Sequence, residues 1–165
     1  MTEDSKDYAP GLNERLGGYD SAMGLRFVSA TLDEIVAELP VAPKHHQPYG
    51  LVHGGVYAGI VETVCSVGAA LNALQHGRSA VGLENATSFV RAARSGTLRA
   101  RAVPLVRGRR TQVWEARIED EEGNLLAHGK VRLLCLESGA AMAGEVVHAK
   151  KPALSSPSDD AGGEG

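Results

Sequence analysis

Hydrophobic residues change their spacing along the chain at one long run without proline. Residues 53–76 carry Ala, Val, Ile and Leu at helical intervals and lead to Gly77, a residue typical of helix ends. This pattern predicts one helix roughly 35 Å long. After it the period becomes two, which predicts four strands, over 79–93, 96–108, 110–120 and 124–137.

Two further strands are predicted before the helix. Residues 25–41 contain two β-like stretches around a polar break at Leu32 and Asp33, and residues 42–50 form a loop with two prolines. The long helix is apolar almost all round, so most of its faces must be covered. An antiparallel sheet that curves around it would do this, and we therefore expect an α+β fold.

The length and the two chain ends predict a single folded domain. A chain of 165 residues is large enough to bury one core. Residues 1–19 and 139–165 are polar or rich in small residues, and we expect both to be flexible segments. The folded domain is therefore predicted over residues 20–138.

Composition argues against several classes of partner. The net charge of −3 disfavours binding to nucleic acid or to a membrane surface. The first twenty residues lack the apolar stretch of a signal peptide, and Glu62, Thr63 and Asn72 interrupt the best candidate for a membrane span. We expect a cytoplasmic protein that binds neither membranes nor nucleic acid.

The cysteines and histidines do not predict a metal site. Cys65 and Cys135 both lie in apolar segments, where an intracellular protein keeps its thiols reduced and buried. His45 and His46 are adjacent, which is poor geometry for chelating one ion, and no Cys/His spacing is typical of zinc. We therefore expect no metal.

Glu62 is the only acidic or basic side chain between His53 and His76. Its neighbours at helical spacing are small residues, and none of them is a charge partner. One interpretation is a narrow solvated helix face. The other is a functional carboxylate, because leaving an unpaired carboxylate desolvated costs several kcal/mol.

Gly54 and Gly55 predict a second feature at the start of the helix. The first N–H groups of a helix are unpaired, and the absence of Cβ atoms lets a ligand oxygen approach them. Such donors polarise a carbonyl and are worth about 3 kcal/mol in a transition state. The alternative is only a flexible helix start.

The spacing between these two features predicts a dimer. Nine residues from His53 to Glu62 span roughly 13 Å of helix, so Gly54 and Glu62 of one chain cannot contact the same carbonyl. Two antiparallel helices related by a two-fold axis would bring Gly54 of one chain to Glu62 of the other. If both features are functional, the active unit is at least a dimer with two shared sites.

The stretch Q47-P-Y-G-L-V-H53-G54-G55-V-Y-A-G-I-V-E62 resembles the signature of the hotdog-fold acyl-CoA thioesterases. The similarity is closest to the phenylacetic-acid-degradation type and to the Glu-dependent 4-hydroxybenzoyl-CoA thioesterases. These families carry an amide side chain six residues before the histidine and an acid nine residues after it, the places of Gln47 and Glu62. The resemblance covers roughly residues 20–138 and implies a hotdog fold, with one central helix wrapped by a curved sheet.

The resemblance also implies a role for each residue of the signature. The Gly54 N–H polarises the thioester carbonyl, and Glu62 of the facing subunit acts as nucleophile or as the base that activates water. Gln47 positions the thioester or the water, and Ser66 hydrogen-bonds near Glu62, although Glu-dependent relatives often carry Thr there. His53 and Gly55 contribute to the helix start that receives the substrate, where His53 has a structural role.

The implied reaction is hydrolysis of an acyl-CoA to a carboxylic acid and CoA, and it needs no cofactor. Relatives commonly pair two dimers, so the resemblance implies a homotetramer. Small residues on the helix would suit a flat aromatic or medium-chain acyl group.

A run of arginines without acids supports a CoA ligand. Seven arginines and no acid lie between Asn85 and Trp114. Guanidinium groups bind phosphate bidentately, so this run is a candidate clamp for the phosphates of CoA. Solvated strand faces are the alternative, and nucleic acid is disfavoured by the net charge and the shortage of aromatic residues. The candidate residues are Arg91, Arg107, Arg109, Arg110 and Thr111.

Two other functions remain open for the same fold. A hotdog enoyl-CoA hydratase or dehydratase needs a histidine base beside the acyl chain, whereas His53 adjoins two glycines. A non-catalytic acyl-CoA-binding sensor would carry a DNA-binding segment, and residues 1–20 are too short for one and lack a helix-turn-helix pattern.

Overall fold

The computed structural model describes residues 6–146. The predicted helix and all six predicted strands are confirmed, each to within a few residues. The main elements are α1 (Ala9–Glu14), α2 (Gly18–Met23), β1 (Arg26–Ala30), β2 (Ile35–Pro40), α3 (Gly54–Leu74), β3 (Ser79–Phe89), β4 (Thr97–Arg107), β5 (Thr111–Glu119) and β6 (Leu125–Leu136). A short 3-10 turn at Pro43–His45 precedes α3, and a small hairpin of β7 (Ala141–Met142) and β8 (Glu145–Val146) follows β6.

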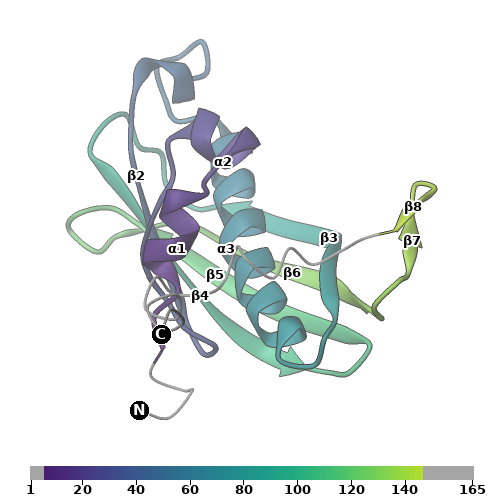
Figure 1. The fold of residues 1–165 in the computed structure, drawn as a ribbon. Helices are drawn as coiled ribbons and strands as arrows, with labels where there is room; N and C mark the ends of the chain where they lie inside the picture. Colours follow the sequence, from purple (N-terminus) through teal and green to yellow (C-terminus); the bar gives the residue numbers. More distant parts are fainter. Residues whose placement is uncertain (1–5, 147–165) are drawn as a thin grey trace.

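The six main strands form one antiparallel sheet in the order β1-β2-β4-β5-β6-β3. The helix α3 lies across one face of this sheet and contacts β2, β3, β4, β5 and β6 (Figure 1). Although β3 directly follows α3, it pairs with β6 at the far side of the sheet, so β3 and β1 are the two edge strands. The predicted α+β architecture is confirmed.

Close contact between α3 and β5 anchors the helix to the middle of the sheet. Trp114 is completely buried, and a Cβ atom added at Gly68 would lie 2.5 Å from Cζ3 of its ring. The Trp114 Nε1–H donates to Oε1 of Gln112 at 2.9 Å. Gln112 in turn donates to the Ala69 carbonyl at 3.2 Å, so one buried amide joins the helix backbone to the indole.

The described N-terminal residues belong to the fold, so the prediction of a flexible segment over 1–19 is wrong from residue 6 onward. Asn13 bonds to both the N–H and the C=O of Phe27, at 2.9 and 2.8 Å, and Asp7 accepts from the Ala30 N–H at 2.8 Å. Asp20 accepts from the Thr63 hydroxyl at 2.6 Å and ties α2 to α3. Polar and apolar side chains both attach these helices, since Ala9 and Met23 are buried in the core. Each helix has only six residues, which is too short for a periodic pattern to show.

The other end of the described chain lies away from the core. The hairpin of β7 and β8 projects from the end of β6, and its strand residues are exposed (Figure 1). The predicted C-terminal segment 139–165 is described only as far as residue 146, and its remainder lies outside the described residues.

α3 is the one helix in residues 6–146 that is long and apolar enough to cross a membrane by length and composition. Half of its apolar window is buried inside the protein, as is typical of a core helix.

The contact between Gly68 and Trp114 generates a stability prediction. Gly68→Ala should lower the free energy of unfolding by about 1–3 kcal/mol, because the added methyl overpacks a completely buried ring. The measurement is urea unfolding at one protein concentration, followed by Trp114 fluorescence.

Gly59→Ala is the matched control in the same helix. Its Cβ would meet the ring end of Tyr19, which is 62% exposed and free to move. Alanine is the better helix former by about 1 kcal/mol, so this variant should be neutral or stabilising. Equal destabilisation by both variants would contradict the packing argument.

Candidate active site

The first turn of α3 leaves one backbone donor free. His53 is the N-cap residue, and its Nδ1 accepts from the Gly55 N–H at 2.8 Å. Its carbonyl accepts from the Val56 N–H at 2.9 Å. The Gly54 N–H has no hydrogen-bond partner among residues 6–146. Gly54 is therefore available to a ligand oxygen, whereas Gly55 is occupied by the helix cap.

Hydrogen bonds from two histidines hold the loop before α3. Buried His45 bonds through Nε2 to the Met23 carbonyl at 2.7 Å, and His46 bonds to the Arg94 carbonyl at 2.8 Å. Gln47 follows directly, and its Oε1 accepts from the Tyr49 N–H at 2.6 Å. This bond orients the amide and leaves its NH₂ group without a partner in the described part of the chain.

A groove of about 230 Å³ brings three of the predicted site residues together. Gln47, Gly54 and Arg91 line it, with Tyr57 and Phe89 as its aromatic walls. The Phe89 ring lies so close to the helix tip that a Cβ at Gly54 would be 2.7 Å from its Cε2. Any larger residue at this position would collide with this ring.

The wall of this groove contains a buried phenol. Tyr57 is 3% exposed, and its hydroxyl has no hydrogen-bond partner within residues 6–146. Burial raises the pKa of Tyr57. The phenol is therefore protonated at neutral pH.

Glu62 lies on the same helix as Gly54 but not in the same groove. Eight residues separate them, or about 12 Å along the helix axis. Within one chain the two groups cannot act on a single carbonyl, as the sequence spacing predicts.

The structure corrects the picture of Glu62 as an unpaired, desolvated carboxylate. It is partly exposed, and its Oε1 accepts from the Ser66 hydroxyl at 3.2 Å. Its Oε2 accepts from Nδ2 of Asn85 on β3 at 2.9 Å. The Ser66 contact agrees with the residue pattern. Asn85 was missed, because its approach to Glu62 depends on the local path of β3 rather than on helical spacing.

No nucleophilic thiol competes with Glu62 at this position. Burial raises the pKa of the Cys65 thiol, and the charges of Glu62 and Glu115 raise it further. The thiol is therefore protonated and inert at neutral pH. Both cysteines are buried and unpaired, and no cluster of three or more His, Cys, Asp or Glu residues in the described part of the chain could hold a metal.

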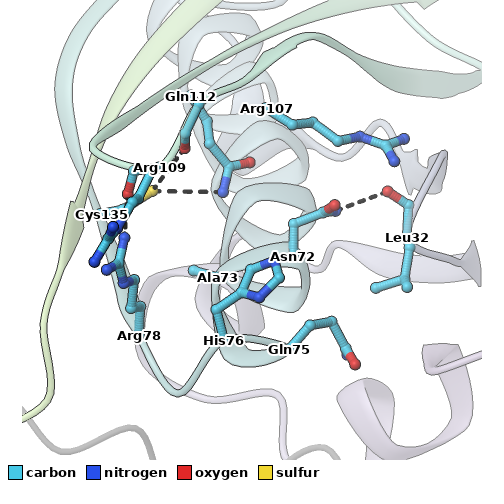
Figure 2. Close-up of a pocket in the computed structure, with 11 residues that line it drawn as sticks. Leu32, Asn72, Ala73, Gln75, His76, Arg78, Arg107, Arg109, Gln112 and Cys135 are labelled. Carbon is cyan, nitrogen blue, oxygen red and sulfur yellow. Dashed lines mark hydrogen bonds between the residues drawn. The ribbon is translucent and has the colours of Figure 1, made fainter.

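The other arginine candidates lie at the opposite end of α3. A cavity of about 600 Å³ opens there, lined by Arg107 and Arg109 together with Arg78, His76 and Cys135 (Figure 2). Arg110 in the β4–β5 connection and Thr111 at the start of β5 are both exposed. Within one chain the predicted CoA clamp is therefore divided, with Arg91 in the groove beside Gly54 and the other candidates elsewhere.

Acids from a distant segment neutralise part of the arginine run. Arg107 pairs with Asp33, and Arg99 and Arg101 pair with Glu38 and Glu34 on or beside β2. The absence of acids in the local sequence was therefore misleading, because the pairing of β2 with β4 supplies them across the sheet.

Comparison with known proteins identifies the family of the chain. A family model described as the thioesterase superfamily matches residues 49–127. Rv1847 of Mycobacterium tuberculosis, which bears an esterase name, is 43% identical over 122 residues, covering 73% of this chain and 87% of that protein. A 1,4-dihydroxy-2-naphthoyl-CoA hydrolase of Listeria monocytogenes is 35% identical over 109 residues, covering 66% of this chain and 88% of that protein.

A solved structure shows the same fold. The thioesterase HI1161 from Haemophilus influenzae superposes with a TM-score of 0.76 at 32% identity, over 83% of this chain and 96% of that chain. The chain belongs to the thioesterase superfamily and has its hotdog fold. It is a thioester hydrolase.

The cap at His53 generates a prediction that separates a structural role from a catalytic one. His53→Ala should lower the free energy of unfolding by about 1 kcal/mol, because the Gly55 N–H loses its acceptor. His53→Asn should keep both stability and thioester hydrolysis, since asparagine is a good N-cap but no base at neutral pH. Thermal unfolding and a thiol-release assay check the pair. Loss of hydrolysis in a stable His53→Asn protein would contradict the structural role.

Proposed function

We propose that this protein is a Glu-dependent acyl-CoA thioesterase whose active sites each combine two subunits. The observation that carries the proposal is the free Gly54 N–H in a groove with Gln47, on the same helix as a carboxylate about 12 Å away. The overall reaction is R–CO–S–CoA plus water giving R–COOH and HS–CoA.

An exposed edge strand supports the two-fold arrangement. β3 is an edge strand of eleven residues, and most of it is exposed in the single chain. Leu83 and Phe89 on this strand are 51% and 58% exposed. Long edge strands with exposed apolar residues are rarely left uncovered. A second copy of the chain against β3 and the Glu62 face of α3 would cover them, and a pair of such dimers would give the tetramer.

The proposed chemistry divides between the two subunits. The thioester oxygen lies at the Gly54 N–H, where the helix dipole stabilises the negative charge that develops in the transition state. The Gln47 amide donates to the thioester or to the water. Glu62 of the facing subunit either takes a proton from the attacking water, or attacks the carbonyl carbon directly. In the second case water then hydrolyses the anhydride between the acyl group and Glu62, which releases the carboxylic acid and restores the carboxylate. The C–S bond breaks, and the thiolate leaves as CoA and takes up a proton.

The groove is compatible with an aromatic acyl group. Tyr57 and Phe89 line it with their ring centroids 6.1 Å apart, and flat apolar walls favour a flat substrate. The named substrate of the Listeria hydrolase is an aromatic acyl-CoA, which supports the same class here. His53 is engaged in the helix cap, so the structure offers no histidine base for hydratase chemistry at this tip.

Removal of the carboxylate tests the proposal. Glu62→Ala should lower kcat for an aromatic acyl-CoA such as benzoyl-CoA by about 10²- to 10⁴-fold, because no other group can take its place. Release of free CoA is followed with a thiol reagent, and size-exclusion chromatography checks that the oligomer persists.

Glu119→Gln is the matched control for Glu62→Ala. Glu119 is the last residue of β5 and pairs at 3.4 Å with Arg117 in an exposed ion pair. Such pairs contribute about 1 kcal/mol or less, so this variant should keep wild-type turnover. Full activity of Glu62→Ala would refute the assignment.

We further propose that Arg91 binds the CoA part of the substrate close to the thioester, since it is the arginine candidate that shares the groove with Gly54. Arg91→Ala should raise KM for the thioester by about tenfold with little change in kcat, because the lost contact is equal in the ground and transition states. Arg109→Ala, at the other end of α3, should leave KM unchanged. If KM rises in Arg109→Ala and not in Arg91→Ala, the CoA phosphates bind at the β4–β5 connection instead.

A further inference from the structure

Hydrogen bonds connect the side chains of Thr87, Asn85 and Glu62 in a row. The Thr87 hydroxyl donates to Oδ1 of Asn85 at 2.6 Å. The Nδ2 group of Asn85 then donates to Oε2 of Glu62 at 2.9 Å and to the Ala58 carbonyl at 3.0 Å. Each Asn85 atom faces partners of the complementary kind, since the oxygen meets a donor and the nitrogen meets two acceptors. The amide is therefore held in one orientation.

An irregularity in β3 aims Asn85 at the helix. Gly82 pairs with Leu133 and Asn85 pairs with Val131, so four residues of β3 lie opposite three of β6. Leu133 and Val131 are both completely buried and share the core face of the sheet. The extra residue brings Gly82 and Asn85 to that same face, although regular alternation would direct them to opposite sides.

Two glycines leave the space that this chain of side chains needs. A Cβ atom at Gly82 would lie 2.5 Å from Oε1 of Glu62. A Cβ atom at Gly129 on β6 would lie 2.7 Å from the Thr87 hydroxyl oxygen. Alanine at either position would displace the carboxylate or the hydroxyl. The register of β3, its hydrogen bonds and the space left by the two glycines therefore all favour this arrangement of Thr87, Asn85 and Glu62.

We propose that Asn85 is a positioning residue that sets the rotation of the Glu62 carboxylate, and that Thr87 acts through it by holding the Asn85 amide in the donating orientation. This inference rests on the proposed role of Glu62 in thioester hydrolysis. Asn85 does not contact the reacting atoms. With Ser66 on Oε1 and Asn85 on Oε2, both oxygens of the carboxylate have a donor, and the group is held in a single plane.

Removing Asn85 or Thr87 should lower kcat, because the Glu62 carboxylate would then be free to rotate about its terminal torsion. The terminal torsion of a glutamate has a broad preference, so external donors must fix the carboxylate plane. A misplacement of about 1 Å at a reacting group costs about 10²-fold in rate. Without Thr87 the Asn85 amide can rotate by half a turn, and its oxygen would then repel the carboxylate.

The test compares kcat and KM for benzoyl-CoA hydrolysis in matched variants. Asn85→Ala should lower kcat by about 10- to 100-fold with KM within about twofold of wild type. Asn85→Asp keeps the size but places a second carboxylate beside Glu62, and its kcat should fall at least as far. Asn72→Ala is the control, since Asn72 also donates from its side chain to backbone carbonyls but lies at the other end of α3.

Thr87 supplies a test that does not depend on how well the Asn85 variants fold. Thr87→Val keeps the shape of the side chain but removes its hydroxyl, and it should lower kcat severalfold. Thr87→Ser keeps the hydroxyl and should have a kcat close to that of the wild type. In the double variant Asn85→Ala with Thr87→Val, kcat should equal that of Asn85→Ala alone, because Thr87 has no other route to Glu62. A merely structural contribution of Thr87 would instead multiply the two losses.

The outcomes separate this inference from the proposed function. The positioning role is overturned if a correctly assembled Asn85→Ala protein has the wild-type kcat, or if the two losses in kcat multiply in the double variant. In either case an inactive Glu62→Ala protein would still support the proposed function. If the wild type releases no CoA, or if Glu62→Ala is fully active, the proposed function itself fails.

Discussion

The close approach of α3 to the sheet is the constraint on which the rest of the structure depends. Glycines at the contact points make it possible, with Gly68 on the helix facing the Trp114 ring and Gly82 on β3 facing the Glu62 carboxylate. Where the backbones lie this close, a side chain on one element meets the other within hydrogen-bond reach. The same packing that buries the core therefore brings a strand amide to a helix carboxylate.

The periodicity of the sequence predicted α3 and all six main strands, because these elements bury one face or most of their surface. It failed for α1 and α2, which have only six residues each and so show no clear period. The signature around Glu62 predicted the candidate site residues on α3 and in the loop before it. It did not find Asn85, since an extra residue in β3 reverses which side chains face the helix.

Long-range pairing explains the other difference. The arginines between Asn85 and Trp114 looked unpaired in the sequence, yet Arg99, Arg101 and Arg107 meet acids on or beside β2. A charge pattern within one segment carries no information about the strand that will lie next to it. Arg91 has no such cross-strand acid among the salt bridges of the described residues, and it lies at the groove instead.

The irregularity between Gly82 and Glu84 also bears on how related chains can be compared. An ungapped alignment assumes that equal positions in a strand face the same way, and one extra residue breaks that assumption for everything on one side of it. A homologue with a regular β3 would have to carry its equivalent amide one step out of register with Asn85. Residues of β3 in two related chains are therefore equivalent when their side chains point to the same face of the sheet. An asparagine that is absent from an aligned position can lie one position away and make the same contact.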